Sequence, residues 1–191
     1  ALIKNLLLIY SGKNEEAISN LQEFDFKKYK NKPAQVLDLK LTQVVALFLQ
    51  KKFKEAFQVY LDFNHSDTWY IKKTGYVWVI QKNLIEILIL IELNHFDLLE
   101  SRLKSFKKKH RVHLIEHNEF RILDFLNLIT VYYYKTEKIH SKEFMKKVET
   151  SLNIKSNNED VFTISFYAWL KSKIENTEIY KTCLDLIDAM E

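Results

Sequence analysis

The chain has 191 residues and a formal net charge of +4, and 47% of its residues are hydrophobic. Only two residues are glycine and one is proline, whereas average usage would give roughly 12% of a chain. Folds built from many short strands need these residues in their turns, and phosphate-binding or dinucleotide-binding loops need several glycines close together, so both classes are excluded. The apolar fraction is large enough for a hydrophobic core, and we therefore expect an all-α protein.

Apolar residues recur at helical spacing along almost the whole chain, which predicts about ten helices. The first covers residues 1–10, and the second starts at Asn14, its expected N-cap, after a turn at Gly12. Gly75 predicts either a break or a close packing contact within a longer helix. Because glycine and proline are so rare, most other turns must be made by Asn, Asp, Ser and Lys. The further helices are expected at residues 33–50, 53–64, 67–94, 96–109, 118–135, 141–152, 159–173 and 177–190.

The expected helices form pairs, in which the first is apolar over a wide arc and the second is amphipathic. A helix with apolar residues on several sides needs neighbours on several sides. Equivalent positions of the second helices recur at spacings of 39 to 45 residues, at Ala17, Ala56, Leu99, Phe144 and Cys183. We therefore expect a single domain over residues 1–191, made of about five antiparallel helical hairpins that stack on one another.

Two segments resemble the tetratricopeptide-like (TPR-like) helical-repeat superfamily: residues 12–21, and the run Phe53-Lys54-Glu55-Ala56, which is similar to the family's aromatic-x-Glu-Ala pattern. The resemblance covers about the first 110 residues. The spacing is longer than the family's 34 residues, and the Trp-x-x-Leu-Gly-x-x-Tyr half of its motif is absent. The resemblance implies a right-handed α-solenoid that acts as a non-catalytic scaffold for a protein or peptide partner.

Polar residues on the apolar helices indicate the inner, concave surface of such a solenoid. Gln43 and Glu86 each precede a repeat position by 13 residues, which suggests a solvated stripe. Glutamates on an apolar helix cannot be buried without a partner at acceptable cost, so they line this surface or pair with lysine. In the run of three tyrosines at 132–134, at least one ring should face solvent or a groove. The candidate partner-binding residues are Asp38, Gln43, Gln81, Glu86, Glu92 and Tyr133.

Three histidines, His110, His113 and His117, would share one face if their segment were helical, and could then hold zinc. We expect instead a solvated connection between two helices, and therefore no metal or other cofactor. No arrangement typical of a nucleophile is present, so we do not expect an enzyme. Cys183 lies within an apolar stripe and is expected to be a small core residue.

The partner is expected to be a protein or peptide. Lysine outnumbers arginine 26 to 3, and the basic runs lie at expected helix ends, which argues against nucleic acid. No stretch of the sequence is apolar enough to span a membrane. The single cysteine excludes an internal disulfide and fits a reducing compartment such as the cytoplasm.

The first helix is apolar and the chain does not begin with Met, so we expect the C-terminal part of a longer protein. Preceding repeats, or a second copy of the chain, would then cover that helix. Two alternatives to the scaffold remain open. One is a ligand- or peptide-sensing domain of a bacterial regulator, in which a ligand changes the curvature of the solenoid. The other is an RNA-binding α-solenoid, whose binding would depend steeply on salt.

Overall fold

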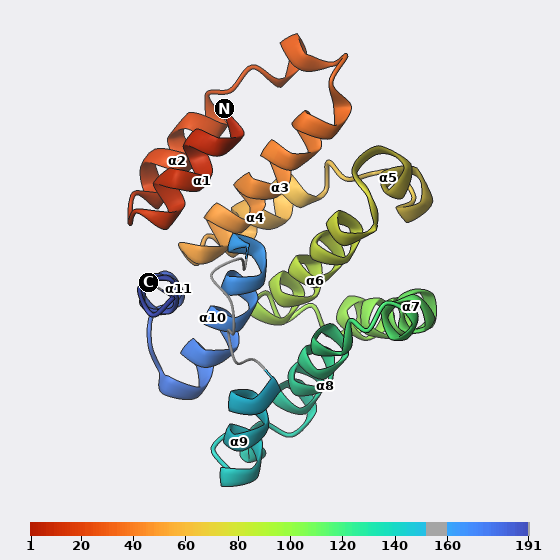
Figure 1. The fold of residues 1–191 in the computed structure, drawn as a ribbon, viewed down its shortest axis with the longest axis vertical. Coiled ribbons are helices and arrows are strands. Elements are labelled where there is room, and N and C mark those ends of the chain that lie inside the picture. Colours follow the sequence, from red (N-terminus) through yellow and green to blue (C-terminus); the bar gives the residue numbers. More distant parts are fainter. Residues whose placement is uncertain (152–159, 191) are drawn as a thin grey trace.

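The computed structural model describes residues 1–151 and 160–190 and is all-helical (Figure 1). These ranges contain eleven α-helices, two short 3₁₀ helices and no strand, which confirms the expected all-α class. The α-helices are α1 (Leu2–Tyr10), α2 (Asn14–Gln22), α3 (Pro33–Leu49), α4 (Phe53–Tyr60), α5 (Asp67–Thr74), α6 (Tyr76–Glu92), α7 (Phe96–Glu116), α8 (Phe120–Tyr134), α9 (Lys142–Ser151), α10 (Val161–Glu175) and α11 (Ile179–Asp188). The 3₁₀ helices are η1 (Phe26–Tyr29) and η2 (Thr136–Lys138).

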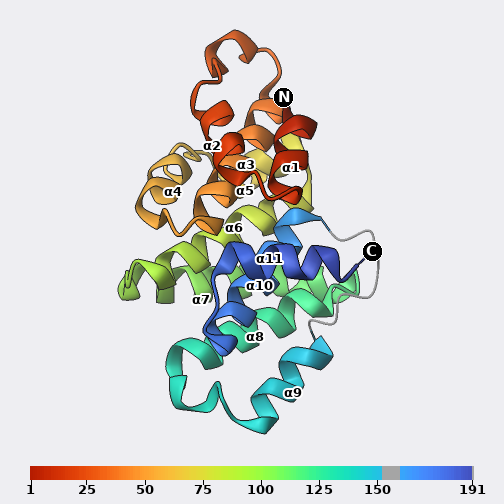
Figure 2. The same cartoon turned by 90° about the vertical axis from the view of Figure 1, so that its left-hand side faces the viewer.

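Most helices pack against their neighbours in the chain, as α1 does on α2, α3 on α4, α6 on α7 and α7 on α8. The hairpin of α10 and α11 departs from this order, because α10 lies against α3 and α6 (Figure 2). It also returns to the start of the chain. The Tyr180 hydroxyl donates to the Ile9 carbonyl at 2.7 Å, and Lys51 lies 3.2 Å from Glu178. The expected last pair of helices therefore forms, but it is covered by helices from the first half of the chain.

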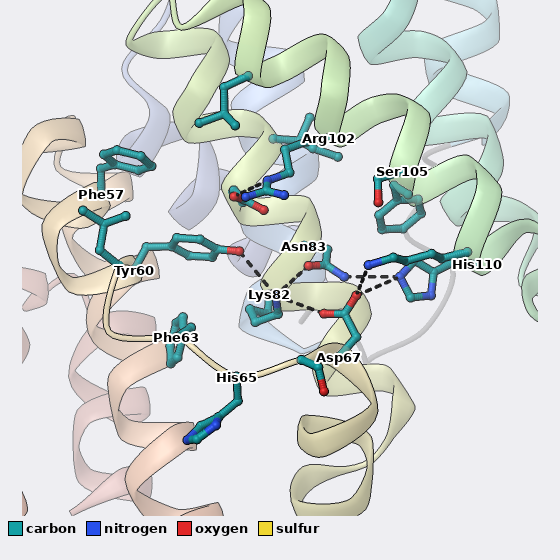
Figure 3. Close-up of a pocket in the computed structure, with 17 residues that line it drawn as sticks. Phe57, Tyr60, Phe63, His65, Asp67, Lys82, Asn83, Arg102, Ser105 and His110 are labelled. Carbon is teal, nitrogen blue, oxygen red and sulfur yellow. Dashed lines mark hydrogen bonds and ion pairs between the residues drawn. The ribbon is translucent and has the colours of Figure 1, made fainter.

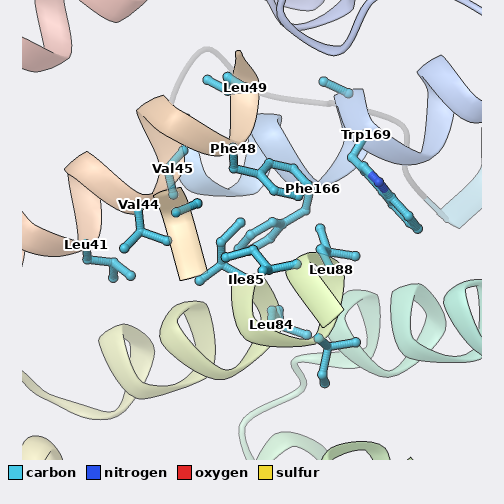
Figure 4. Packing of buried hydrophobic residues seen from close by; sticks show 14 of the residues in the cluster. Leu41, Val44, Val45, Phe48, Leu49, Leu84, Ile85, Leu88, Phe166 and Trp169 are labelled. Atoms are coloured by element: carbon cyan, nitrogen blue, oxygen red, sulfur yellow. The ribbon is translucent and has the colours of Figure 1, made fainter. Parts of the chain in front are cut away.

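The hydrophobic core lies where α3, α6 and α10 meet (Figure 4). On α3 every residue from Leu41 to Leu49 is buried, and on α10 so is every residue from Ile164 to Leu170. Consecutive burial means that each helix is covered on all sides, as the wide apolar arcs predict. Phe48, Ile85 and Trp169 are fully buried there, one from each helix.

Helix boundaries follow the local sequence at most turns. Gly75 has φ +93° and separates α5 from α6, and no atom lies within 4 Å of where its Cβ would be. Its conformation, and not a close approach, therefore requires glycine. Other turns use Lys51, Asn94, Asn118 and Asn176, all with φ between 54° and 59°. Asparagine tolerates this left-handed region better than most residues, as expected for a chain with little glycine.

Three expectations about boundaries are wrong. Helix α4 ends at Tyr60, with Leu61 as its C-cap, and not at residue 64. Asn14 is the first residue of α2 and does not cap it, because its buried side chain donates to the Ala46 carbonyl of α3 at 2.8 Å. Helix α7 does not end near residue 109 but continues to Glu116. Its buried stripe runs through His110 to Leu114, and this stripe extends the helix across the segment expected as a connection. The expected ends at residues 152 and 159 lie outside the described residues.

Candidate functional site

A polar cavity of about 300 Å³ opens between α4, the start of α5, α6 and α7 (Figure 3). Four helices contribute charged or polar side chains to it, so residues far apart in sequence meet there. The residues that define it are Tyr60, Asp67, Lys82, Glu86, Arg102 and His110. Ser66 caps α5 by accepting a hydrogen bond from the Trp69 amide at 3.3 Å, and this cap fixes the first turn that carries Asp67.

Asp67 is the centre of the charge network. Its two carboxylate oxygens lie 3.3 Å from the ammonium groups of Lys82 and Lys109, respectively. Burial alone would raise the pKa of Asp67, but the two nearby lysines outweigh burial and hold that pKa below its ordinary value. The carboxylate therefore stays ionised at neutral pH and joins α5 to both α6 and α7.

Lys82 is only 5% exposed, and its ammonium group is fully engaged. It donates to the Tyr60 hydroxyl at 3.3 Å and to the Asn83 side-chain oxygen at 2.7 Å, and it pairs with Asp67. An ammonium group has three donors, and these three partners use all of them. Burial lowers the pKa of Lys82, while the charges of Asp67 and Glu86 oppose that change. Burial, with the negative charge of Glu86 added, holds the pKa of Tyr60 well above its ordinary value.

His110 is neutral, and its tautomer follows from its partners. The Asn83 oxygen accepts from Lys82, so the Asn83 amide nitrogen faces the His110 Nε2 atom at 3.3 Å and donates to it. Nε2 is then an acceptor, and Nδ1 carries the proton and donates to the Tyr76 hydroxyl at 2.7 Å. Burial lowers the pKa of His110, with the charges of Lys109 and Lys82 acting in the same direction and that of Asp67 against it.

The charges of the polar cavity differ in depth. Both carboxylates and the Lys82 ammonium group are buried, since the side chains of Glu86, Lys82 and Asp67 are 7%, 7% and 18% exposed. The other two cations point outward, with the side chain of Arg102 46% exposed and that of Lys109 56% exposed. The Arg102 Nε atom donates to Glu86 at 2.8 Å, which holds the guanidinium at the mouth. The cavity therefore presents positive charge to solvent.

A second, apolar cavity of about 440 Å³ lies between α6, the end of α7, α8 and α10. Its walls are mainly aliphatic and aromatic, and they include Ile80, Leu84, Ile122, Phe125 and Phe166. The two cavities share a wall. The ring of Tyr76 lines the apolar cavity, and its hydroxyl bonds to His110 of the polar cavity.

The candidate concave residues on α6 lie in three different surroundings. Gln81 donates to Asp160 at 2.9 Å, and Glu92 pairs with Lys173 at 2.6 Å. Both partners belong to the segment that begins α10 or to α10 itself, so the chain's own C-terminal hairpin occupies these two positions. Glu86 instead faces α7 and lies in the polar cavity.

The other three candidates lie on α3 and α8. Gln43 is 7% exposed on α3, and burial raises the pKa of Asp38 on the same helix. Tyr133 on α8 lies beside Phe96 of α7, with ring centroids 5.7 Å apart. The structure thus does not bring the six residues into one cluster, and partner binding by them stays a prediction.

The three histidines are on or next to α7, not in a connection. His110 is hydrogen-bonded to Tyr76 and Asn83 as described, while the rings of His113 and His117 stack with their centroids 3.9 Å apart. Within residues 1–151 and 160–190, no group of three His, Cys, Asp or Glu side chains is placed to hold a metal ion.

None of the helices in these ranges is both long and apolar enough to cross a membrane. Cys183 is buried, and burial raises the pKa of its thiol to about 12, as suits a core residue.

Sequence reasoning missed most of the polar cavity. It named Glu86 and His110 as candidates, but not Tyr60, Asp67 or Lys82. The spacing held a usable signal, because Lys82 and Glu86 are four residues apart on one face of an apolar helix. Nothing in the sequence links either of them to Asp67, which reaches the site through the turn at Gly75.

Comparison with known proteins gives no family for this chain. No protein-family model, curated protein or solved structure matches it. The resemblance to TPR-like repeats therefore stays a prediction from its motifs, and the function has to be argued from the chemistry of the site.

Proposed function

We propose that this chain is a non-catalytic binding domain of the TPR-like type, a right-handed α-solenoid that holds a segment of a protein or peptide. The solenoid is supported by the packing of α2 on α1 and α3, of α4 on α3 and α6, and of α7 on α6 and α8. The single buried cysteine supports a reducing compartment such as the cytoplasm.

The observation that carries the proposal is the difference in depth between the charges of the polar cavity. Arg102 and Lys109 face outward above buried carboxylates, so the mouth attracts a negatively charged group. Exposed apolar side chains flank it, with Leu61 54% and Leu98 36% exposed. An acidic peptide segment with a neighbouring apolar side chain matches both features, since charge steers such a contact and an apolar anchor strengthens it.

The same geometry supports binding without catalysis. A catalytic acid, base or nucleophile must reach the substrate with a free donor or acceptor. All three donors of Lys82 are taken by protein partners, and both ring nitrogens of His110 are hydrogen-bonded. The two most perturbed bases of the cavity therefore hold the fold together.

Binding of labelled peptides tests the proposal. Short fluorescein-labelled peptides that alternate glutamate and leucine should bind, and the same peptides with lysine in place of glutamate should not. Lys109→Ala should weaken binding about tenfold, because it removes an exposed cation from the mouth. Arg102→Lys should also weaken it, since lysine keeps a charge near Glu86 but loses the planar fork.

Lys108→Ala is the matched control, because Lys108 is an exposed lysine of α7 that does not line the cavity. Equal binding by Lys108→Ala and Lys109→Ala would refute the assignment of the site. Preferential binding of a generic RNA, with a steep loss of affinity in salt, would favour the RNA-binding alternative.

The second candidate function is the ligand- or peptide-sensing domain of a bacterial regulator. The observation that favours it is the Tyr76–His110 hydrogen bond, which links the walls of two separate cavities. A ligand in one cavity can then alter the other through a short chain of contacts.

A further inference from the structure

We propose that the apolar cavity is a second binding site, which takes an uncharged and largely apolar small molecule. We further infer that Tyr76 transmits its occupancy to the polar cavity. This site is distinct from the peptide site, and it goes beyond the proposed scaffold function.

The size and lining of the cavity fit such a ligand. About 440 Å³ lies within the range of small-molecule sites, which are concave and mostly apolar with a few polar groups. Four helices line it, and the rings of Phe125 and Phe166 lie 6.0 Å apart in its wall. Four rigid helices, rather than loops, thus shape the space.

The charged groups at its edge explain why the ligand should be uncharged. One oxygen of Asp160 accepts from the Thr163 amide at 2.8 Å, and the other accepts from Gln81 at 2.9 Å. The guanidinium of Arg121 lies over the Tyr167 ring, 5.2 Å from its centroid. Asp160 and Arg121 are thus engaged within the fold, so an ionic ligand would have to displace these contacts, whereas an apolar ligand needs only the space between the walls.

Tyr76 connects this space to the polar cavity. Its ring lies at a tilt against that of His113, with centroids 3.5 Å apart, while its hydroxyl accepts a hydrogen bond from His110 Nδ1. The same imidazole continues through Asn83 to Lys82. A ligand that moves the Tyr76 ring therefore changes the environment of His110.

Fluorescence of N-phenyl-1-naphthylamine, an uncharged apolar dye, tests the site in the whole chain. We expect a saturable, blue-shifted increase in emission with the unaltered protein. Ile122→Trp fills the cavity from a half-buried position, and Val77→Trp covers its mouth from a position 66% exposed, so the second variant spares the core. Each should weaken dye binding at least about tenfold, a free-energy change of about 1.4 kcal/mol.

Val112→Trp is the control, because Val112 is 65% exposed on α7 and does not line the cavity. Failure of the dye to bind the unaltered protein would overturn the proposal. Equal binding by Val77→Trp, Ile122→Trp and Val112→Trp would overturn it too, since the dye would then lie elsewhere.

A separate NMR measurement tests whether Tyr76 transmits the occupancy of the apolar cavity to His110. Adding the dye should shift the ring NMR signals of His110 in the unaltered protein. In Tyr76→Phe, compared at equal occupancy by the dye, the shift should be smaller, because the hydroxyl that bonds to His110 is absent. An equal shift in both proteins would show that Tyr76 does not transmit occupancy. Neither measurement uses the acidic peptides, so failure of this site and failure of the peptide proposal are separate results.

Discussion

Helix α6 has two buried faces, and they are stabilised in different ways. Toward α3 and α10 it presents aliphatic side chains such as Ile85 and Leu88, which gain from burial whatever apolar groups cover them. Toward α4, α5 and α7 it presents Lys82 and Glu86, which are as deeply buried but need specific polar or charged partners. Burial alone stabilises the first face, whereas the second depends on every partner being in place. Substitutions in the apolar face should therefore lower the free energy of unfolding in proportion to the volume removed. In the polar face, the loss of a single charged group should already lower it strongly.

The largest effect should come from breaking the buried ion pair. Asp67→Ala leaves the Lys82 ammonium buried without its carboxylate, and it should destabilise the protein by about 3–5 kcal/mol. The double variant Asp67→Ala with Lys82→Met should recover much of that loss, because no buried charge is then left unpaired and Lys109 is exposed to solvent. Urea unfolding of the two proteins measures the difference. A double variant no more stable than Asp67→Ala would show that the charge was not the cause.

Deleting apolar volume from the other face should cost nearly as much. Leu88 is fully buried, and Leu88→Ala should destabilise the protein by about 3 kcal/mol through lost transfer free energy and a cavity. Leu7→Ala is the control, because Leu7 is 62% exposed on α1 and should change stability by less than about 0.5 kcal/mol. Similar losses in both variants would contradict a core centred on α3, α6 and α10.

A substitution in the turn at Gly75, which joins the helix of Asp67 to α6, should have a smaller effect on stability. Gly75→Ala places a side chain at φ +93°, with no steric neighbour to complicate the result. The expected loss is about 1–2 kcal/mol from the backbone conformation alone. Thermal unfolding followed by circular dichroism measures it. An unchanged midpoint would mean that the two helices can join without the left-handed turn.

The smallest effect should appear as pH dependence. The folded-state pKa of His110 lies below its ordinary value of 6.5, so the unfolded chain binds the proton more readily. The contribution of neutral His110 is present above pH 6.5 and is lost as pH falls below it, with a slope of at most about 1.4 kcal/mol per pH unit. His110→Gln should flatten this slope in urea unfolding between pH 7.5 and 5.5, and replacing the exposed His140 should not.

Much of the fold follows from the sequence, because helical periodicity and the two glycines are local features. The wide apolar arc of residues 164–170 shows that α10 must be covered on all sides. It does not show that α3 and α6 provide the cover, since any apolar surface would satisfy the same pattern. The polar cavity has the same limitation. Lys82 indicates that a partner is needed, but Asp67 and Tyr60 become partners only through tertiary packing. The continuation of α7 was missed because His110 was treated as solvated, although it belongs to the buried stripe.

The return of the last hairpin to the first helices has a consequence for synthesis. Tyr180 bonds to the carbonyl of Ile9, 171 residues earlier, and α10 covers apolar faces of α3 and α6. At a translation rate of about 5–20 residues per second, those faces stay uncovered for several seconds until residues 160–190 have left the ribosome. A nascent chain stopped before α10 should therefore recruit chaperones or aggregate, whereas a chain that includes α10 covers its own core.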